Sequence, residues 1–366
     1  MIEFTPSDEQ KMLRDSIHRF AENDIRKAAH EADEHSATPP EVVAKGWELG
    51  ILPGLIPEEY GGYADGQSAI TGALALEEVA WGDLSVALNI WTPSLFALPI
   101  LMSGTAEQKQ QFLPRFCDTQ RPIMTAAVIE ASVMFDVWKP SVTITKKQSK
   151  VTLDGEKTYV PLATEAEAMI VYGRDSQTGQ VDGYIVERET SGLEVCERNQ
   201  LMGIRALPTY RIKLSGVTVS PDQRIGGEKG TEFARIINRS RIALGAMAVG
   251  VARAAFEYAR DYARERVQFG VPIASKQAIA FRLADMAIEV DAARLLVWEA
   301  AWQADQGNDS TQSAAVLKQH IARMALFVTD SAVQILGGHG YIREHPVERW
   351  LRNARGFSTF DGLAMV

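Results

Sequence analysis

The stretch that decides the fold of this chain is AVQILGGHGYIREHPVERWLRNAR, residues 332–355. It closes a long segment of helical periodicity, 311–336, with several glycines in a row. Such glycines are typical of a helix C-cap followed by a turn. The same glycines would also let a cofactor approach bare backbone, and the residues alone leave both interpretations open.

Helical periodicity extends upstream of this stretch over two more long segments. Residues 233–264 and 273–302 repeat apolar side chains with a helical period, as does 311–336. At 1.5 Å per residue, each segment would run about 35 to 45 Å. Three or four long antiparallel helices over 227–366 predict a helical bundle.

The central part of the chain, 121–226, has a period of two instead. Short apolar runs recur at close spacing, and Asp154-Gly155 is a candidate hairpin turn. The expected strands include Ala168 to Tyr172, Val181 to Val186 and Arg211 to Leu214. These residues predict a compact antiparallel β domain.

The first 120 residues are again helical in pattern. Thr5, followed by Pro6 and Asp8, is a candidate N-cap for the first helix. Residues 50–66 are too rich in glycine and proline for a helix and predict a structured loop. The apolar stretch 86–102 is interrupted by polar residues and prolines, so it predicts a buried helical hairpin rather than a membrane span.

Composition excludes several classes of function. The formal charge of −9 over 366 residues argues against nucleic acid or an anionic membrane as a partner. Two cysteines, Cys117 and Cys196, make no disulfide framework and favour the reducing cytoplasm. The cluster HEADEH, 30–35, lacks the spacing of a zinc site, so we expect a solvated helix face and no metal.

Four segments carry a resemblance to a known family: LIPEEYGG (55–62), GTAEQKQQFLPRF (104–116), ARERVQFGVPIASKQAIAFRLADM (263–286) and the stretch quoted first. Along essentially its whole length the chain resembles the acyl-CoA dehydrogenases. The resemblance implies an N-terminal helical domain (1–120), an antiparallel β-barrel-like middle domain (121–226) and a C-terminal four-helix bundle (227–366). It also implies a cytoplasmic homodimer or homotetramer with FAD at a subunit interface.

The family removes a proton from the carbon α to a thioester carbonyl while hydride leaves the β carbon for the flavin. So weak a carbon acid needs a carboxylate held in a dry pocket and hydrogen bonds to the carbonyl oxygen. Where the family has glutamate, this chain has Asp361, between Phe360 and Gly362. Aspartate is one methylene shorter, which would set the carboxylate about 1 Å back. The resemblance places Arg241 and Asn238 at the thioester end of the substrate site, where Asn238 replaces the more frequent aspartate.

The resemblance also implies a set of cofactor-binding residues. They lie around the connection between the first two long helical segments and around the end of the third. In relatives, residues at these positions reach the FAD of a neighbouring subunit, where a guanidinium suits the pyrophosphate and glycines allow close approach. The matching residues here are Arg266, Phe269, Gln277, Gln334, Gly337 and Gly338.

The flavin cradle of the β domain departs from the family pattern. Val128 and Ile129 stand where relatives carry a threonine that touches the flavin, and Met134-Phe135 replace small residues. Downstream, Tyr159-Val160-Pro161 replaces a Trp-Ile-Thr pattern, which removes a hydroxyl and a backbone N–H. Each lost hydrogen bond costs about 1 kcal/mol. The FAD site is therefore expected to be degenerate, and loss of FAD binding is an open alternative.

Three functions remain after this comparison. The first is α,β-dehydrogenation of an acyl thioester, on coenzyme A or an acyl carrier protein, with electrons passing to a flavoprotein or to oxygen. The second is a non-catalytic or half-site subunit in a mixed complex, which would make the assembly a hetero-oligomer. The third is a repurposed, flavin-independent enzyme acting on an acyl thioester.

Overall fold

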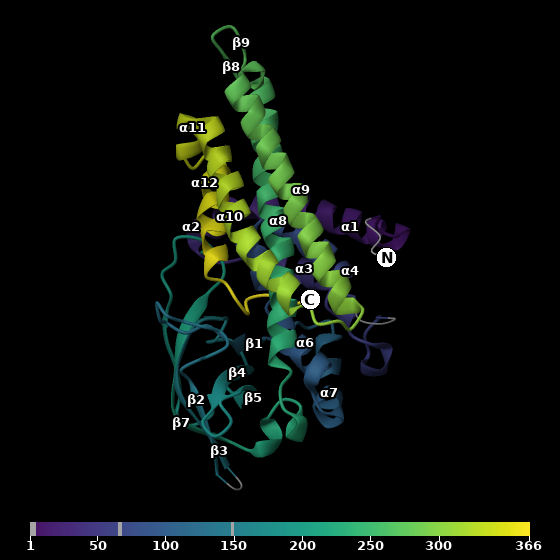
Figure 1. Ribbon diagram of the computed structural model, residues 1–366, viewed down its shortest axis with the longest axis vertical. Coiled ribbons are helices and arrows are strands. Elements are labelled where there is room, and N and C mark those ends of the chain that lie inside the picture. The colour runs from purple at the N-terminus through teal and green to yellow at the C-terminus, as the bar shows by residue number, and fades with distance from the viewer. Residues whose placement is uncertain (1–4, 65–67, 148–149) are drawn as a thin grey trace.

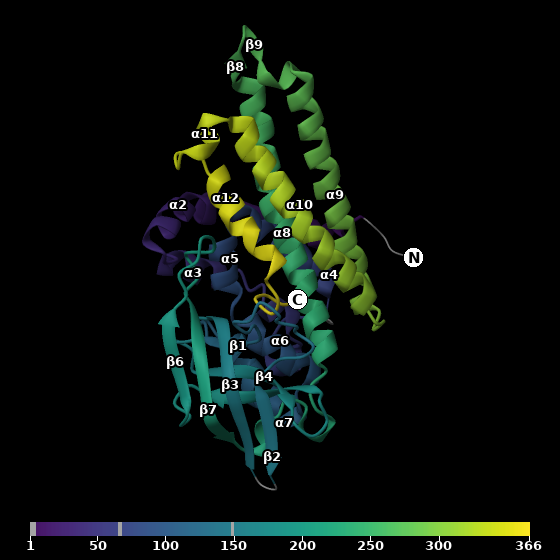
Figure 2. The same cartoon turned by 60° about the vertical axis from the view of Figure 1, so that its left-hand side comes forward.

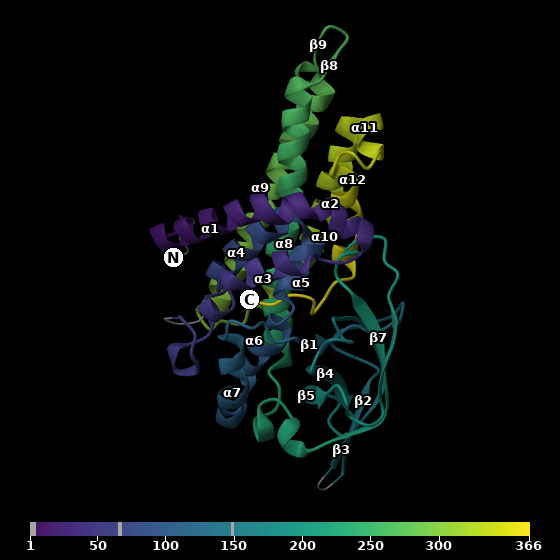
Figure 3. The ribbon, with the colours of Figure 1, turned by 180° about the vertical axis from the view of Figure 1, so that it is seen from behind.

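The computed structural model describes residues 5–64, 68–147 and 150–366, arranged as two helical regions and a β region. Figure 1 shows an elongated molecule with the β strands at one end and the long C-terminal helices rising from them to the other. The N-terminal helices pack across the back of the long helices, as the reverse view shows (Figure 3). The expected order of helical, β and helical parts is confirmed.

The N-terminal region contains seven α-helices. They are α1 (Asp8–Phe20), α2 (Arg26–His35), α3 (Pro40–Glu48), α4 (Ala69–Gly82), α5 (Leu84–Trp91), α6 (Ser94–Ser103) and α7 (Ala106–Phe112). The cap of α1 is Ser7 and not Thr5, because Ser7 and Gln10 form a reciprocal capping box. The expected loop contains two short 3₁₀ turns, Pro53–Leu55 and Glu58–Tyr60, and its last two positions lie outside the described residues.

The expected helical hairpin is formed by α5 and α6, whose side chains are almost all buried in the protein. Among the described residues, one single helix, α8 (Phe233–Glu265), is long and apolar enough to cross a membrane. In that helix, 78% of the apolar window is buried inside the protein. Its apolar character is therefore accounted for by packing against the other helices.

The β region forms one seven-stranded sheet of mainly antiparallel pairs. Its strands are β1 (Met124–Ala127), β2 (Thr143–Lys147), β3 (Lys150–Pro161), β4 (Ala168–Asp175), β5 (Val181–Glu187), β6 (Leu193–Arg198) and β7 (Thr209–Val219). The order is β1-β4-β2-β3-β7-β6, with β5 on β4, and both β1 and β2 run parallel to β4 (Figure 2). Asp154-Gly155 is not a hairpin turn but an irregularity inside β3, where Gly155 has φ of +136° against Val142.

The C-terminal region is built on three long helices, α8, α9 (Gln277–Asp305) and α10 (Thr311–Leu336). The short hairpin of β8 (Val267–Gln268) and β9 (Val271–Pro272) joins α8 to α9 at the far tip of the molecule. After α10 the chain reverses through α11 (Gly338–Tyr341), and α12 (Val347–Ala354) packs back along α10. The fourth member of this bundle is thus a short helix.

One side chain of the HEADEH cluster contradicts its expected exposure. Asp33 is 2% exposed, and its carboxylate accepts hydrogen bonds from Arg352 of α12 and from Arg343. The helix face carrying Asp33 therefore joins the N-terminal helices to the C-terminal region instead of facing water.

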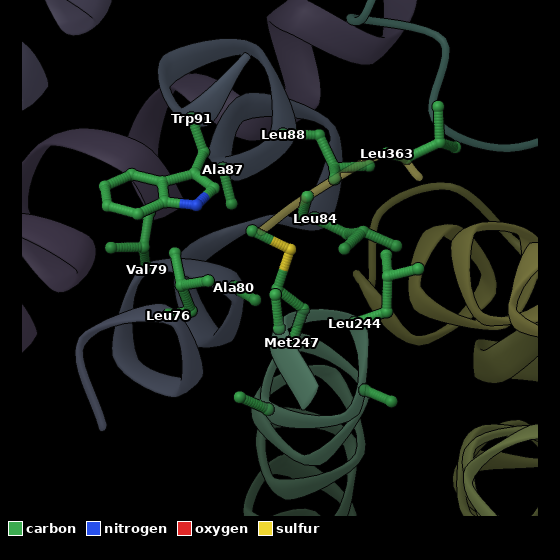
Figure 4. Close-up of a cluster of buried hydrophobic side chains, with 14 of the residues drawn as sticks. Leu76, Val79, Ala80, Leu84, Ala87, Leu88, Trp91, Leu244, Met247 and Leu363 are labelled. Carbon is green, nitrogen blue, oxygen red and sulfur yellow. The ribbon is translucent and has the colours of Figure 1, made fainter. Parts of the chain in front are cut away.

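The core is centred on α8, which packs against α4 on one side and α10 on the other. Figure 4 shows Leu244 and Met247 of α8 beside Leu84 and Leu88 of α5, with Leu363 at the edge of the same group. The chain after α12 thus ends its path in the core, and residues 361 and 362 contact Ser240 and Arg241 in the N-terminal third of α8.

The closest approach of α8 to α4 depends on a glycine. A Cβ at Gly250 would lie 2.1 Å from the backbone oxygen of Glu77, which cannot move without shifting α4. We expect Gly250→Ala to lower the free energy of unfolding by about 1–3 kcal/mol despite the better helix propensity of alanine. The matched control is Gly245→Ala on the same helix, where a Cβ would meet only the side-chain ends of Leu317 and Val297. Equal unfolding midpoints in denaturant for the two variants would contradict the backbone contact as the cause.

Candidate active site

Asp361 is positioned by a turn that requires glycine. The short 3₁₀ turn Arg355–Ser358 leads into it, and Gly362 then adopts φ of +65°. The N–H of Gly362 donates to Ser240 Oγ of α8 at 2.9 Å. A Cβ at 362 would lie 2.4 Å from Val128 Cγ2, so no larger residue fits without displacing Val128, the residue after β1.

Two cations flank the Asp361 carboxylate, which is 9% exposed. Arg241 Nε donates to Oδ1 at 3.1 Å, and Lys318 Nζ lies 3.7 Å from Oδ2. Lys318 also donates to the backbone oxygen of Phe360. The sequence-based reasoning missed Lys318, although a signal was present: it stands four residues after Ala314 and three before Ile321, on the buried face of α10.

These groups border a cavity of about 820 Å³, which we call the main cavity. Of the residues expected to bind flavin or substrate, Ile129, Tyr159, Arg241 and Asp361 lie on its wall. Lys318 lies there as well, together with other residues of the β domain and of α10, namely Glu130, Trp138, Thr158, Asn199 and Gln319. The main cavity therefore lies between the β domain and the long helices.

Arg241 contacts an aromatic side chain as well as Asp361. Its guanidinium carbon lies 5.6 Å from the ring centroid of Trp138, which packs edge-on against Phe233. In the same loop, Phe135 lines the main cavity, whereas Met134 is 86% exposed and is not among the lining residues. Only one of the two bulky residues in this loop therefore takes up space in the site.

Tyr159 has a strained backbone at the edge of the main cavity. Its φ is +53°, in a region that costs a non-glycine residue about 1–3 kcal/mol. The strain coincides with a register shift of β3 against β7, and the Tyr159 N–H donates to Asn199 Oδ1 at 3.3 Å. Tyr159 also lines a smaller neighbouring cavity of about 200 Å³, whose wall includes Phe360.

Glu130, on the wall of the main cavity, belongs to a buried ion pair. Lys157 Nζ donates to Glu130 Oε1 at 2.8 Å and to the backbone oxygen of Val128 at 2.9 Å. Burial lowers the pKa of Lys157 to about 8, while Glu130 acts in the opposite direction. Burial would raise the pKa of Glu130, but Lys157 and the N–H donors of Ser141 and Val142 lower it instead.

A second cavity of about 540 Å³, here the tip cavity, lies at the other end of α8. Arg266, Phe269, Gly337 and Gly338 line it, whereas Gln277 and Gln334 are exposed side chains outside its lining. Within the described ranges Arg266 makes no ion pair. A Cβ added at Gly337 or at Gly338 would have no neighbouring atom within 4 Å. A free guanidinium beside bare backbone fits the pyrophosphate of a dinucleotide.

Asn238 lies away from both cavities. It is 3% exposed, and its Nδ2 donates to Thr311 Oγ1 at 2.9 Å, which joins α8 to the start of α10. Among the residues that the structure describes, no group of three histidine, cysteine, aspartate or glutamate side chains could hold a metal ion.

The two cavities lie far apart along α8. Arg241 lines the main cavity and Arg266 the tip cavity, and the two residues are separated by 25 positions, which corresponds to about 37 Å along the helix.

Comparison with known proteins gives these cavities a context. The sequence models of the acyl-CoA dehydrogenase N-terminal, middle and C-terminal domains match residues 7–120, 125–217 and 230–365. The chain belongs to the acyl-CoA dehydrogenase family. It is 34% identical to a probable acyl-CoA dehydrogenase, YngJ, of Bacillus subtilis (strain 168), over 99% of this chain and 97% of that protein.

Two solved structures show how far the likeness extends. Butyryl-CoA dehydrogenase from Megasphaera elsdenii has a TM-score of 0.89 and 32% identity, covering 98% of this chain and 96% of that one. The prolyl acyl carrier protein oxidase AnaB has a TM-score of 0.85 and 25% identity, covering 97% and 96%. The solved structures that resemble this chain are thus named for a coenzyme A thioester in one case and for an acyl carrier protein in the other.

The family points to FAD, and the residues present fit it. The main cavity has room for a flavin ring and offers polar groups from Thr158, Tyr159 and Asn199. The tip cavity offers the unpaired Arg266 and two glycines. Ile129 still brings no hydroxyl to the wall, but the space that the flavin needs is present.

The contribution of the Glu130–Lys157 ion pair to stability can be tested by mutation. Glu130→Gln leaves a buried ammonium without its carboxylate, and we expect a loss of about 3–5 kcal/mol in the free energy of unfolding. The lysine pKa is lower in the folded than in the unfolded chain, so stability should rise with pH across the interval between the two values. Without Glu130 this interval extends to lower pH.

Denaturant unfolding between pH 7 and 9 checks this expectation. Glu130→Gln should recover part of its lost stability as the pH rises, while the double variant Glu130→Gln/Lys157→Met should not, because it has no ammonium to titrate. Parallel pH profiles for the single and the double variant would overturn the assignment.

Proposed function

We propose that this protein catalyses FAD-dependent α,β-dehydrogenation of an acyl thioester, with Asp361 as the base. One observation carries the proposal: a buried carboxylate lies on the wall of a cavity large enough for a flavin and a substrate end, beside Arg241. The role of Asp361 follows from its place in the family pattern and from this geometry.

Asp361 and Arg241 have different roles in the proposed removal of the proton. Asp361 takes a proton from the α carbon of the substrate, whose C–H electron pair moves toward the thioester carbonyl. As the carboxylate becomes neutral, Arg241 remains charged beside the anionic substrate fragment and stabilises it. FAD, held by the main cavity and the tip cavity of a second copy, supplies the acceptor for the hydride from the β carbon. Burial of Asp361 keeps bulk water away from the carboxylate during the transfer.

We infer a homodimer or homotetramer from the position of the tip cavity. An exposed apolar stripe on α9 supports it: Phe281, Ile288 and Leu295 follow each other at seven-residue spacing and are 61%, 64% and 46% exposed. Such a stripe on one helix face is suited to bury against a second copy. The acyl group is proposed to arrive on coenzyme A or on a carrier protein, and the electrons to leave to a flavoprotein or to oxygen.

Asp361→Asn tests the base. The amide cannot take the α proton, so we expect the variant to retain FAD while its bleaching by an acyl thioester slows by about 10²–10⁴-fold. The measurement is anaerobic stopped-flow absorbance of the flavin band. Asp136→Asn is the matched control, because Asp136 is an exposed carboxylate on the same cavity wall. Bleaching at the wild-type rate in Asp361→Asn would exclude Asp361 as the base.

Arg266→Ala tests the tip cavity. Removal of the unpaired guanidinium should lower the FAD content at equal protein concentration at least about tenfold, while the thermal unfolding of the apoprotein is unchanged. Flavin released on denaturation after gel filtration measures it. Arg264→Ala, an exposed arginine two residues earlier that is not in the cavity lining, should keep the wild-type content. Full FAD content in Arg266→Ala would remove the tip cavity from the cofactor site.

A further inference from the structure

The Lys318 side chain is only 12% exposed, and it shares its carboxylate partner with Arg241. Burial lowers its pKa, Asp361 acts in the opposite direction, and Arg241 lowers it further. The fully buried lysine of the site, Lys157, has Glu130 at 2.8 Å, whereas Lys318 Nζ is 3.7 Å from the carboxylate of Asp361. Burying an ammonium costs several kcal/mol, and this distant, shared partner offsets less of that cost than Glu130 does for Lys157. A role in the site accounts for it better than a role in stability.

Among the described residues, the hydrogen bond and the ion pair of Lys318 are with two consecutive residues. Its ammonium donates to the backbone oxygen of Phe360 and lies beside Oδ2 of Asp361. The same short segment is held on its other side by α8, where Ser240 accepts from Gly362 N–H and Arg241 contacts Oδ1. Lys318 thus links α10 to the segment 360–362.

This contact matters more for aspartate than it would for glutamate. The aspartate side chain has a single methylene, so the reach of its carboxylate into the main cavity is set almost entirely by the backbone at 361. A displacement of about 1 Å can cost about 10²-fold in rate. A cation that fixes both the preceding carbonyl and one carboxylate oxygen removes that freedom.

We propose that Lys318 is the positioning residue of the base, and this proposal rests on the proposed role of Asp361. Lys318 orients the carboxylate between α8 and α10, and each oxygen keeps a lone pair for the cavity side. In the step itself the α C–H bond breaks, an O–H bond forms on Asp361, and the electron pair stays on the substrate. Lys318 keeps its three protons and remains, with Arg241, a positive neighbour of the anionic fragment.

Solvent deuterium exchange isolates this step from hydride transfer. The FAD-loaded protein, with its flavin reduced beforehand so that it cannot accept hydride, is mixed anaerobically in D₂O with a panel of short, medium and branched acyl thioesters of coenzyme A and of phosphopantetheine, and deuterium at the α carbon is followed by mass spectrometry. We expect Lys318→Met to slow exchange about 10–100-fold with less than about threefold change in substrate KM, and Lys318→Arg to recover part of the rate. Lys229→Met, an exposed lysine, is the control.

A double variant separates positioning from general support of the fold. If Lys318 acts through Asp361, Lys318→Met should add no further loss of exchange to Asp361→Asn, whereas a merely structural effect would add its own. Additive losses, or wild-type exchange in Lys318→Met alone, would overturn the proposal.

A measurement that does not depend on activity distinguishes the positioning role of Lys318 from the proposed function of the protein. In Lys318→Met the amide of Gly362 should exchange with solvent at least about tenfold faster, while the amides of α8 keep their protection. Unchanged protection of 360–362 would overturn the positioning role even if activity fell. Faster exchange at 360–362, in a protein whose wild-type form labels none of the thioesters, would overturn the proposed function and leave the contact of Lys318 with this segment standing.

Discussion

The contact between Arg241 and Asp361 joins the N-terminal third of α8 to a segment 120 residues later in the chain. It exists because Gly362 turns left-handed and donates to Ser240, one residue before Arg241 on α8. The β domain approaches the same point, since Val128 fills the space that a side chain at 362 would need. Helical bundle and β domain therefore meet at this point, and the main cavity opens there.

The burial of the residues around Asp361 depends on how α8 is packed. Gly250 lets α4 approach at backbone distance, and the residues after Gly362 enter the apolar space between α5 and α8, with Trp91 Nε1 donating to the oxygen of Met365 at 2.7 Å. A carboxylate held at the edge of such a core is shielded from water on one side and open to a cavity on the other. That environment is what a base for a weak carbon acid needs.

Long periodic elements could be predicted from the sequence, because their apolar spacing is a local property. The helix over Thr311–Leu336 is found at the predicted residues. Failures occurred where a distant partner decides the outcome: Asp154-Gly155 continues β3 because β7 pairs on both sides of it. Asp33 is buried because Arg352 reaches it from α12. Lys318 was missed for the same reason, since only the fold brings α10 to Asp361.

The charges around the base suggest how an aspartate can replace a glutamate. Arg241, Lys318 and Asp361 together carry a net positive charge, since two cations surround one carboxylate. The nearby Glu130–Lys157 pair is neutral as a whole and does not change this balance. In the proposed proton transfer the negative charge would move from Asp361 to the substrate, with Arg241 and Lys318 beside it in both states. The proposed reaction would therefore need no rearrangement of the cations.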